Sequence, residues 1–221
     1  FYVFAESIFI PIFLIVGIWG GNNRLKALYK MFIFSCITSL LFLFAITYIY
    51  TNFGTTNLRL LLNIGVIPEI QIWLFLAFMA VFSIKIPLWP FHSWVSEINS
   101  ECPSAFSIIL ICIILKISGY GLLRFSLPLF PNASLFLQDY IFYLSFITIS
   151  YSLILCFFQT NFQKLIAYYS FSHMGLIIIG IFSFNKQGLD GAMFQMISDG
   201  LIFAGLLLSL GILNQLFKSQ E

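Results

Sequence analysis

Charge is what this sequence lacks most. Of its 221 residues only 8% are charged, whereas 61% are hydrophobic and 19% are aromatic. A water-soluble domain carries about 25% charged residues, so the composition excludes a soluble protein and favours one that crosses a membrane several times. A single membrane anchor is excluded too, because apolar residues run from end to end. The formal net charge of +2 provides neither a basic surface for nucleic acid nor an acidic tail.

Cofactor motifs are absent as well. The four cysteines stand apart, without a C-x-x-C pair or a Cys/His cluster, so no zinc or iron–sulfur site is predicted. No G-x-G-x-x-G follows a strand pattern, which excludes the usual nicotinamide or flavin motif. We therefore predict that this chain binds no cofactor and no metal. It begins with Phe and shows no signal-peptide pattern, so we expect a fragment of a longer protein.

Long hydrophobic runs are abundant. A transmembrane helix needs about 20 mostly apolar residues, and the roughly ten-residue alternation of a membrane barrel is absent. We therefore predict an all-α, polytopic transmembrane bundle of about seven spans. The runs are Phe1–Trp19, Met31–Tyr50, Ile70–Phe91, Pro103–Phe125, Tyr140–Phe158, Lys164–Phe184 and Leu189–Phe217.

Basic residues between the runs set the predicted orientation. Short loops on the cytoplasmic or matrix side carry more Lys and Arg than loops on the other side. This rule predicts that the first run ends on the cytoplasmic or matrix side. The richer set of loops holds Arg24, Lys26, Lys30, Lys164 and Lys218, and the poorer set holds Arg59, Arg124 and Lys186.

Three ionisable residues lie deep in these runs. Glu6, Lys85 and Lys116 stand far enough from the run ends to lie ~20 Å deep at 1.5 Å per residue. Each costs at least ~2.5–3.5 kcal/mol in lipid, so such groups normally face a bundle interior or a water-filled cavity. Because opposite charges shift each other's protonation, two lysines that share one carboxylate favour a proton relay. The alternative is a static Glu6–Lys85 ion pair, with Lys116 on a backbone carbonyl.

Two prolines interrupt the run that contains Lys85. Pro87 and Pro90 each remove a backbone donor, so the helix must bend or break there. A broken helix is tolerated at membrane depth where it lines a cavity, which predicts that Lys85 lines a pore. In the alternative, the prolines end the helix at the membrane interface, beside an aromatic belt. The residues of that belt would be Trp89, His92 and Trp94.

A second polar track is predicted in the last two runs. His173 and Asp199 lie well inside apolar helices, and both can exchange protons. The alternative for His173 is a histidine that only forms a hydrogen bond to a neighbour. Small residues would allow close helix contact along this track. They are Gly175, Gly180, Gly200, Gly205 and Gly211.

Several motifs resemble those of a known family. The stretch KIPLWPFHSW from Lys85, followed by Glu97, by ECPSA from Glu101 and by Ser107, resembles the signature of the subunit 4 family of NADH dehydrogenase, antiporter-like subunits of respiratory complex I. The resemblance covers nearly the whole chain in order. Further matches are Glu6 with Pro11 and GIWG from Gly17, LKISGYGLLRF from Leu115, KLIAYYS from Lys164 with SHM from Ser172, and QGLDGA from Gln187.

The resemblance implies an antiporter-like inverted-repeat fold and a function. Residues 1–125 would hold most of the first repeat and residues 126–221 the first part of the second, without the family's terminal helices. The family's glutamate and two lysines match Glu6, Lys85 and Lys116, which implies proton translocation driven by quinone reduction in other subunits. Loop candidates beside this relay are His92, Glu97 and Glu101.

The resemblance also implies partners and a location. NADH, FMN, iron–sulfur clusters and ubiquinone would be bound by other subunits of the complex. Neighbouring antiporter-like subunits and lipids such as cardiolipin would surround the chain, and a separate polypeptide or the rest of a longer chain would supply the terminal helices. The Phe- and Ile-rich composition, typical of an AT-rich organelle genome, favours the mitochondrial inner membrane over a bacterial plasma membrane.

Three positions depart from the family's pattern. Asp199 replaces the usual His, Ser96 the usual Pro and Asn99 a second usual His. Asp199 is titratable but anionic when unprotonated, which changes the electrostatics of the second track, and Asn99 weakens a proton uptake route through the loop after Phe91. Two other functions stay open: a subunit of an Mrp-type cation/proton antiporter, and a structural scaffold that has lost proton transfer. Three deep charges disfavour the scaffold.

Overall fold

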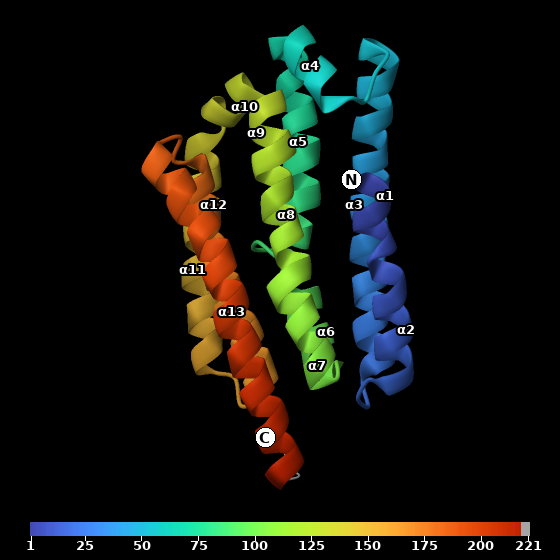
Figure 1. Cartoon of the computed structure of the whole chain (residues 1–221), viewed down its shortest axis with the longest axis vertical. Coiled ribbons are helices and arrows are strands. Elements are labelled where there is room, and N and C mark those ends of the chain that lie inside the picture. Colours follow the sequence, from blue (N-terminus) through green and yellow to red (C-terminus); the bar gives the residue numbers. More distant parts are fainter. Residues whose placement is uncertain (218–221) are drawn as a thin grey trace.

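The chain is a bundle of membrane-spanning helices. The computed structural model describes residues 1–217, and every regular element among them is helical. Seven helices of this part are long and apolar enough to cross a membrane, which confirms the predicted all-α fold. The helices stand side by side along the long axis of the molecule (Figure 1). Lys218, which contributed to the predicted orientation, lies outside the described residues.

The first two spans form a helical hairpin. α1 (Tyr2–Ser7) and α2 (Phe9–Trp19) together make the first span, and α3 (Arg24–Phe53) returns beside them (Figure 1). α3 ends at Gly54, whose φ of 68° is a left-handed conformation that glycine adopts freely. Because α3 begins earlier than predicted, three basic residues assigned to a loop lie in its first turns. They are Arg24, Lys26 and Lys30.

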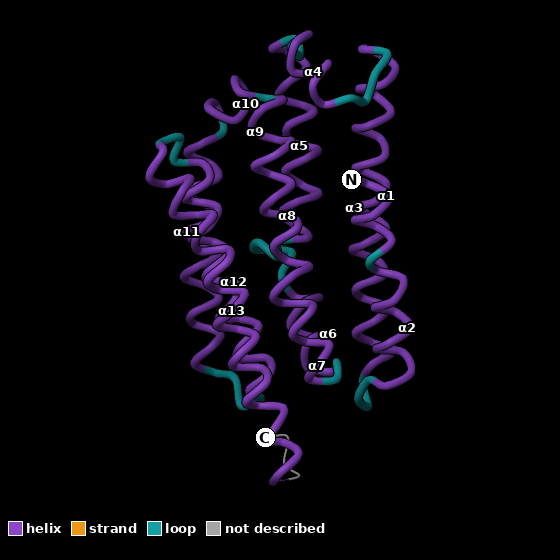
Figure 2. Tube along the Cα trace, viewed as in Figure 1, coloured by secondary structure: helices purple, strands orange, loops and turns teal. Residues whose placement is uncertain are grey.

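The third span is a broken helix, as the prolines predicted. After the short α4 (Leu58–Ile64), α5 (Pro68–Lys85) ends at its lysine, and α6 (Ser93–Glu101) continues after a connection of residues 86–92. Figure 2 shows this connection as a loop in the middle of the helical layer. Of the interfacial belt in the alternative, Trp94 is buried, at 2% exposed, whereas Trp89 is 39% exposed.

The fourth span is continuous but irregular. It consists of α7 (Ser104–Ile109), the π-helical segment η1 (Leu110–Ile114), α8 (Leu115–Gly121), the π-helical segment η2 (Leu122–Ser126) and α9 (Leu127–Leu129). A π-helical segment widens the turn and is frequent at functional sites. The sequence analysis predicted an ordinary helix here, so both π-helical segments are findings of the structure.

The remaining helices pack on the other side of the broken helix. After α10 (Pro131–Phe136), α11 (Gln138–Phe157), α12 (Phe162–Phe182) and α13 (Lys186–Phe217) follow. α12 begins where the Asn161 side chain accepts hydrogen bonds from two backbone amides, a typical N-cap. α12 contacts α6, and α13 contacts α7 and η1. The broken helix and the irregular helix therefore lie between the N-terminal hairpin and the last three helices (Figure 1).

A row of phenylalanines on α5 joins these parts. Phe75, Phe78 and Phe82 follow one another at three- and four-residue spacing, so they lie on one face of the helix. Phe78 and Phe82 contact Phe42 of α3, whereas Phe75 contacts Phe182 of α12. All three are buried, so this apolar row fixes the position of Lys85 one turn further along α5.

Candidate proton-transfer site

Glu6 and Lys85 meet beside the helix break. The Lys85 Nζ donates to Glu6 Oε1 at 2.5 Å, and the two side chains are 10% and 18% exposed. The ammonium also lies 5.2 Å from the centre of the Phe9 ring, where a cation–π contact adds stabilisation. Removing one member of such a buried pair costs about 3–5 kcal/mol, because the other charge is left uncompensated.

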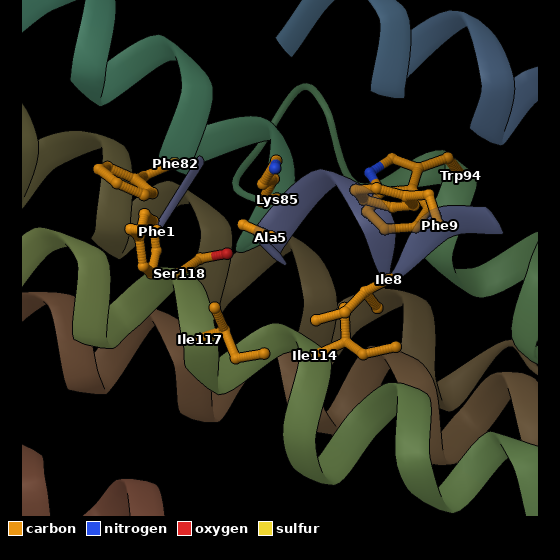
Figure 3. A pocket seen from close by; sticks show the side chains of 10 residues that line it. All are labelled: Phe1, Ala5, Ile8, Phe9, Phe82, Lys85, Trp94, Ile114, Ile117 and Ser118. Carbon is orange, nitrogen blue, oxygen red and sulfur yellow. The ribbon is translucent and has the colours of Figure 1, made fainter. Parts of the chain in front are cut away.

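A small cavity adjoins this pair. It measures about 20 Å³, enough for a single water molecule. Figure 3 shows Lys85 and Ser118 on its wall, with apolar side chains around them. Ile117 and Ser118 follow Lys116 directly on α8, so the cavity lies between the helices that carry the two lysines.

Lys116 is buried next to the first π-helical segment. Lys116 is only 9% exposed. Its Nζ donates to the carbonyl oxygen of Ile111 at 3.3 Å. Ile111 belongs to η1, so the irregular helix presents a backbone acceptor to the lysine on the same span. Among the described residues no salt bridge is formed by Lys116, but the Asp199 carboxylate on α13 attracts it.

His173 and Asp199 form the second polar pair. His173 Nδ1 lies 2.8 Å from Asp199 Oδ1, and Asp199 is fully buried. Gln195 Nε2 donates to the same carboxylate oxygen at 2.8 Å. Asp199 Oδ2, by contrast, is buried without a hydrogen-bond partner among the described residues. Within the described residues the Asp199 carboxylate is therefore held through one oxygen only.

Aromatic rings connect Lys116 to His173. The Lys116 Nζ lies 5.6 Å from the centre of the Phe203 ring, and Phe203 lies 5.5 Å from the His173 ring. The Tyr169 ring also packs against His173, and the two ring centres are 4.6 Å apart. Phe203 follows Asp199 by four residues, so both lie on the same face of α13.

The five predicted relay residues thus fall into two clusters. Glu6 and Lys85 form one, and Lys116, His173 and Asp199 form the other. We expected two lysines to share one carboxylate, but Lys85 alone pairs with Glu6, and Lys116 donates to the Ile111 carbonyl instead. The carbonyl contact of Lys116 in the static alternative is present. His173 is not an isolated histidine, because its partner is titratable.

The three loop candidates lie outside both clusters, just before α6 or on it. His92 precedes α6, whereas Glu97 and Glu101 belong to it, so their assignment to a loop is wrong. Glu97 pairs with Lys30 at 2.5 Å, and Glu101 Oε2 accepts from the backbone N–H of Asn23 at 3.0 Å. These acidic residues attach α6 to the N-terminal hairpin. Asn99 likewise has a structural contact, since its amide donates to the Gln163 carbonyl at 2.7 Å.

Sequence reasoning missed three residues of the site. Gln195, Ser118 and Phe203 carry no charge, and apolar helices contain many such residues. The four-residue spacing from Gln195 to Asp199 was a usable signal, because it places both on one helix face. The glycine prediction holds for Gly175, where an added Cβ would lie 2.6 Å from Ile149, whereas a Cβ added to Gly205 would meet no atom of the described residues within 4 Å.

Comparisons with known proteins agree with this architecture. A family model described as "NADH:quinone oxidoreductase/Mrp antiporter, TM" matches residues 1–220. The curated NADH-ubiquinone oxidoreductase chain 4 of Chondrus crispus is 47% identical over 221 residues, which cover 100% of this chain and 45% of that protein. The chain therefore spans less than half the length of this relative.

Solved structures give the same picture. A chain of respiratory complex I from Thermus thermophilus with bound NADH is 32% identical, with a TM-score of 0.91 over 97% of this chain and 46% of its own length. A chain of the Mrp complex from Dietzia is 18% identical, with a TM-score of 0.83 over 97% of this chain and 23% of its own length, and shares the fold. With its broken helix and its deep charges in place, the chain belongs to the family of NADH:quinone oxidoreductase and Mrp antiporter membrane subunits.

Proposed function

We propose that this chain is part of a proton-translocating subunit in the membrane arm of an NADH:ubiquinone oxidoreductase. Protons would move through Glu6, Lys85, Lys116, His173 and Asp199 while quinone is reduced in other subunits. The observation that carries the proposal is the Glu6–Lys85 pair at the end of α5, buried beside a helix break. Ionisable residues at this depth are rare outside ion and proton pathways.

The proposed mechanism follows from coupled charges. The protonation of one member of a buried pair depends on the charge of the other. A charge that moves in a neighbouring subunit would therefore release or load the proton at Lys85. The cavity beside Ser118 and the Lys116 ammonium offer the next positions, and the His173–Asp199 pair the last in this chain.

The surroundings are part of the proposal. NADH, FMN, iron–sulfur clusters and ubiquinone would be bound by other subunits, and antiporter-like neighbours would lie beside this chain in the mitochondrial inner membrane. Lipids, including cardiolipin, would cover exposed apolar faces such as that formed by Phe146, Ile154 and Phe157 on α11. The remaining helices of the subunit would come from another part of the chain or from a separate polypeptide.

The test is Lys85→Met in the assembled enzyme. We expect NADH-driven proton translocation in closed membrane vesicles to be abolished, while the subunit still assembles. Lys26→Met is the matched control, because Lys26 is exposed at the start of α3, and it should leave translocation unchanged. Where the single variant assembles poorly, Glu6→Gln/Lys85→Met removes both charges and keeps the test.

Two results would contradict the proposal. Full translocation in an assembled Lys85→Met enzyme would leave the Glu6–Lys85 pair a structural contact, as a scaffold requires. Transport that depends on sodium and not on NADH would assign the chain to a cation/proton antiporter of the Mrp type.

A further inference from the structure

The Gln195 side chain contacts both members of the His173–Asp199 pair. Its Nε2 lies 2.8 Å from Asp199 Oδ1 and 3.0 Å from His173 Nδ1, while these two atoms are 2.8 Å apart. All three residues are on α12 and α13, which pack together along their length. The three polar atoms therefore form one compact triangle.

The chemistry of the three groups determines which atom donates each hydrogen bond in this triangle. A carboxylate oxygen only accepts, so the nitrogen end of the Gln195 amide faces it. A separation of 2.8 Å between Nδ1 and Oδ1 requires a proton between them. With Asp199 ionised, this proton belongs to Nδ1, and Oδ1 accepts two hydrogen bonds, from His173 and from Gln195.

The second carboxylate oxygen of Asp199 indicates the role of the Gln195 amide. Asp199 Oδ2 is buried and has no partner among the described residues. Without Gln195 the carboxylate would lose one of the two hydrogen bonds to Oδ1 and could turn away from His173. The amide holds Oδ1 on the histidine. A partner that orients a ligand or a catalytic histidine in this way also fixes which ring nitrogen carries the proton.

We propose that Gln195 is the positioning residue of the second track: it holds the Asp199 carboxylate so that His173 keeps its resting proton on Nδ1 and takes up the transferred proton on Nε2. This inference rests on the proposed function. The transferred proton forms an N–H bond at Nε2, gives an imidazolium whose charge Asp199 offsets, and leaves again as a proton. No electron moves.

The groups that face the pair are few. Tyr169 of α12 and Phe203 of α13 pack against His173, and Lys116 of α8 is attracted by Asp199. Lys116 is the charged one. Its attraction to Asp199 links the orientation of the carboxylate to the charge that the first part of the relay delivers.

The experiment is a double-substitution cycle on NADH-driven proton translocation in vesicles. Gln195→Met keeps the length of the side chain and removes the amide, and we expect a rate about tenfold lower, the worth of one hydrogen bond to a charged group. In an Asp199→Asn or an Asp199→His enzyme, where no carboxylate remains to be held, Gln195→Met should cause no further loss.

A matched control separates positioning from packing. Gln71 of α5 also has a hydrogen-bonded side-chain amide, which donates to the backbone carbonyl of Val66, before α5, at 2.7 Å. Gln71→Met should change the translocation rate by the same factor in enzymes with and without the Asp199 carboxylate.

The outcomes are distinguishable. An equal loss from Gln195→Met in both backgrounds would overturn the positioning role. If Asp199→Asn itself leaves translocation unchanged, the second track of the proposed function fails. If Asp199→Asn lowers translocation but Gln195→Met does not, only the role of Gln195 fails.

Discussion

The Glu6 carboxylate and the Lys85 ammonium stabilise each other at a depth where neither charge would be stable alone. Both side chains are more than four-fifths buried, and the surrounding residues are mainly apolar. Desolvation opposes each charge, and the mutual attraction offsets it only while both are present. The pair can therefore respond to a third charge, because a change at one residue alters what the other tolerates.

This dependence predicts a specific stability pattern. Glu6→Gln alone or Lys85→Met alone should lower the free energy of unfolding by about 3–5 kcal/mol, because each leaves one buried charge uncompensated. The double variant should recover most of that loss. Thermal unfolding of the detergent-solubilised protein measures all three. If the losses of the two single variants add up to the loss of the double variant, the two groups are not coupled.

At the same scale, charged residues of the site were predictable and neutral ones were not. A lysine or glutamate in an apolar helix stands out, because insertion is costly. A serine does not, since its hydroxyl is often satisfied within the helix, as Ser150 is by the Phe146 carbonyl. Ser118 and Gln195 differ from such residues only through neighbours on other helices, and one sequence does not contain those contacts.

Among the elements, the helix break was predictable and the π-helical segments were not. Pro87 and Pro90 remove backbone donors, and this effect is local to the sequence. η1 and η2, with the sequences LICII and LLRFS, contain no glycine or proline. What distinguishes them is their position around α8, where the helix must fit against α5 and α13 at once. Tertiary packing of that kind leaves no local pattern.

The contact between α5 and α8 is close at one glycine. A Cβ added to Gly121 would lie 2.4 Å from the Phe82 ring, and Phe82 is only 1% exposed. Gly121→Ala should therefore destabilise the protein by about 1–3 kcal/mol through overpacking. Because Phe82 lies one turn before Lys85, the substitution would also displace the helices that carry the two lysines. Thermal unfolding and NADH-driven translocation measure the two effects.

Two companion variants make this prediction specific. Gly121→Ala should cost less in a Phe82→Leu protein, where the ring is gone. Gly191→Ala is the control, since that glycine is exposed on α13 and has nothing within 4 Å, and it should stabilise the helix by about 0.5–1 kcal/mol. Equal costs of Gly121→Ala with and without the Phe82 ring would refute the packing argument.

For the whole molecule, the hydrophobic runs predicted the number of spans and their order. Their ends moved by several residues, for example at α3, where a predicted start at Met31 became Arg24. Polar residues at helix ends often continue the helix, so hydropathy alone places such boundaries poorly. Which helices touch was not predictable. The second polar cluster became visible only when α13 was placed against α12 and η1.

The distribution of charge over the molecule leads to the last prediction. The charged pairs at Glu6 and at Asp199 lie inside the bundle, whereas α3, α11 and α13 leave apolar residues exposed. Such a surface fits lipid and neighbouring helices. Because these exposed apolar faces fit neighbouring helices, we expect the chain to occur in a larger assembly.

A native gel tests this at the scale of the assembly. After extraction in mild detergent, peptides of this chain, identified by mass spectrometry, should migrate with a large band that oxidises NADH in the gel. A band of the respiratory complex I type requires redox subunits beside this chain, since no cofactor motif is present in its sequence. Migration in a small band without NADH oxidation would contradict the proposed function. Sodium-dependent transport would then be the activity to measure, because the fold is shared with Mrp antiporters.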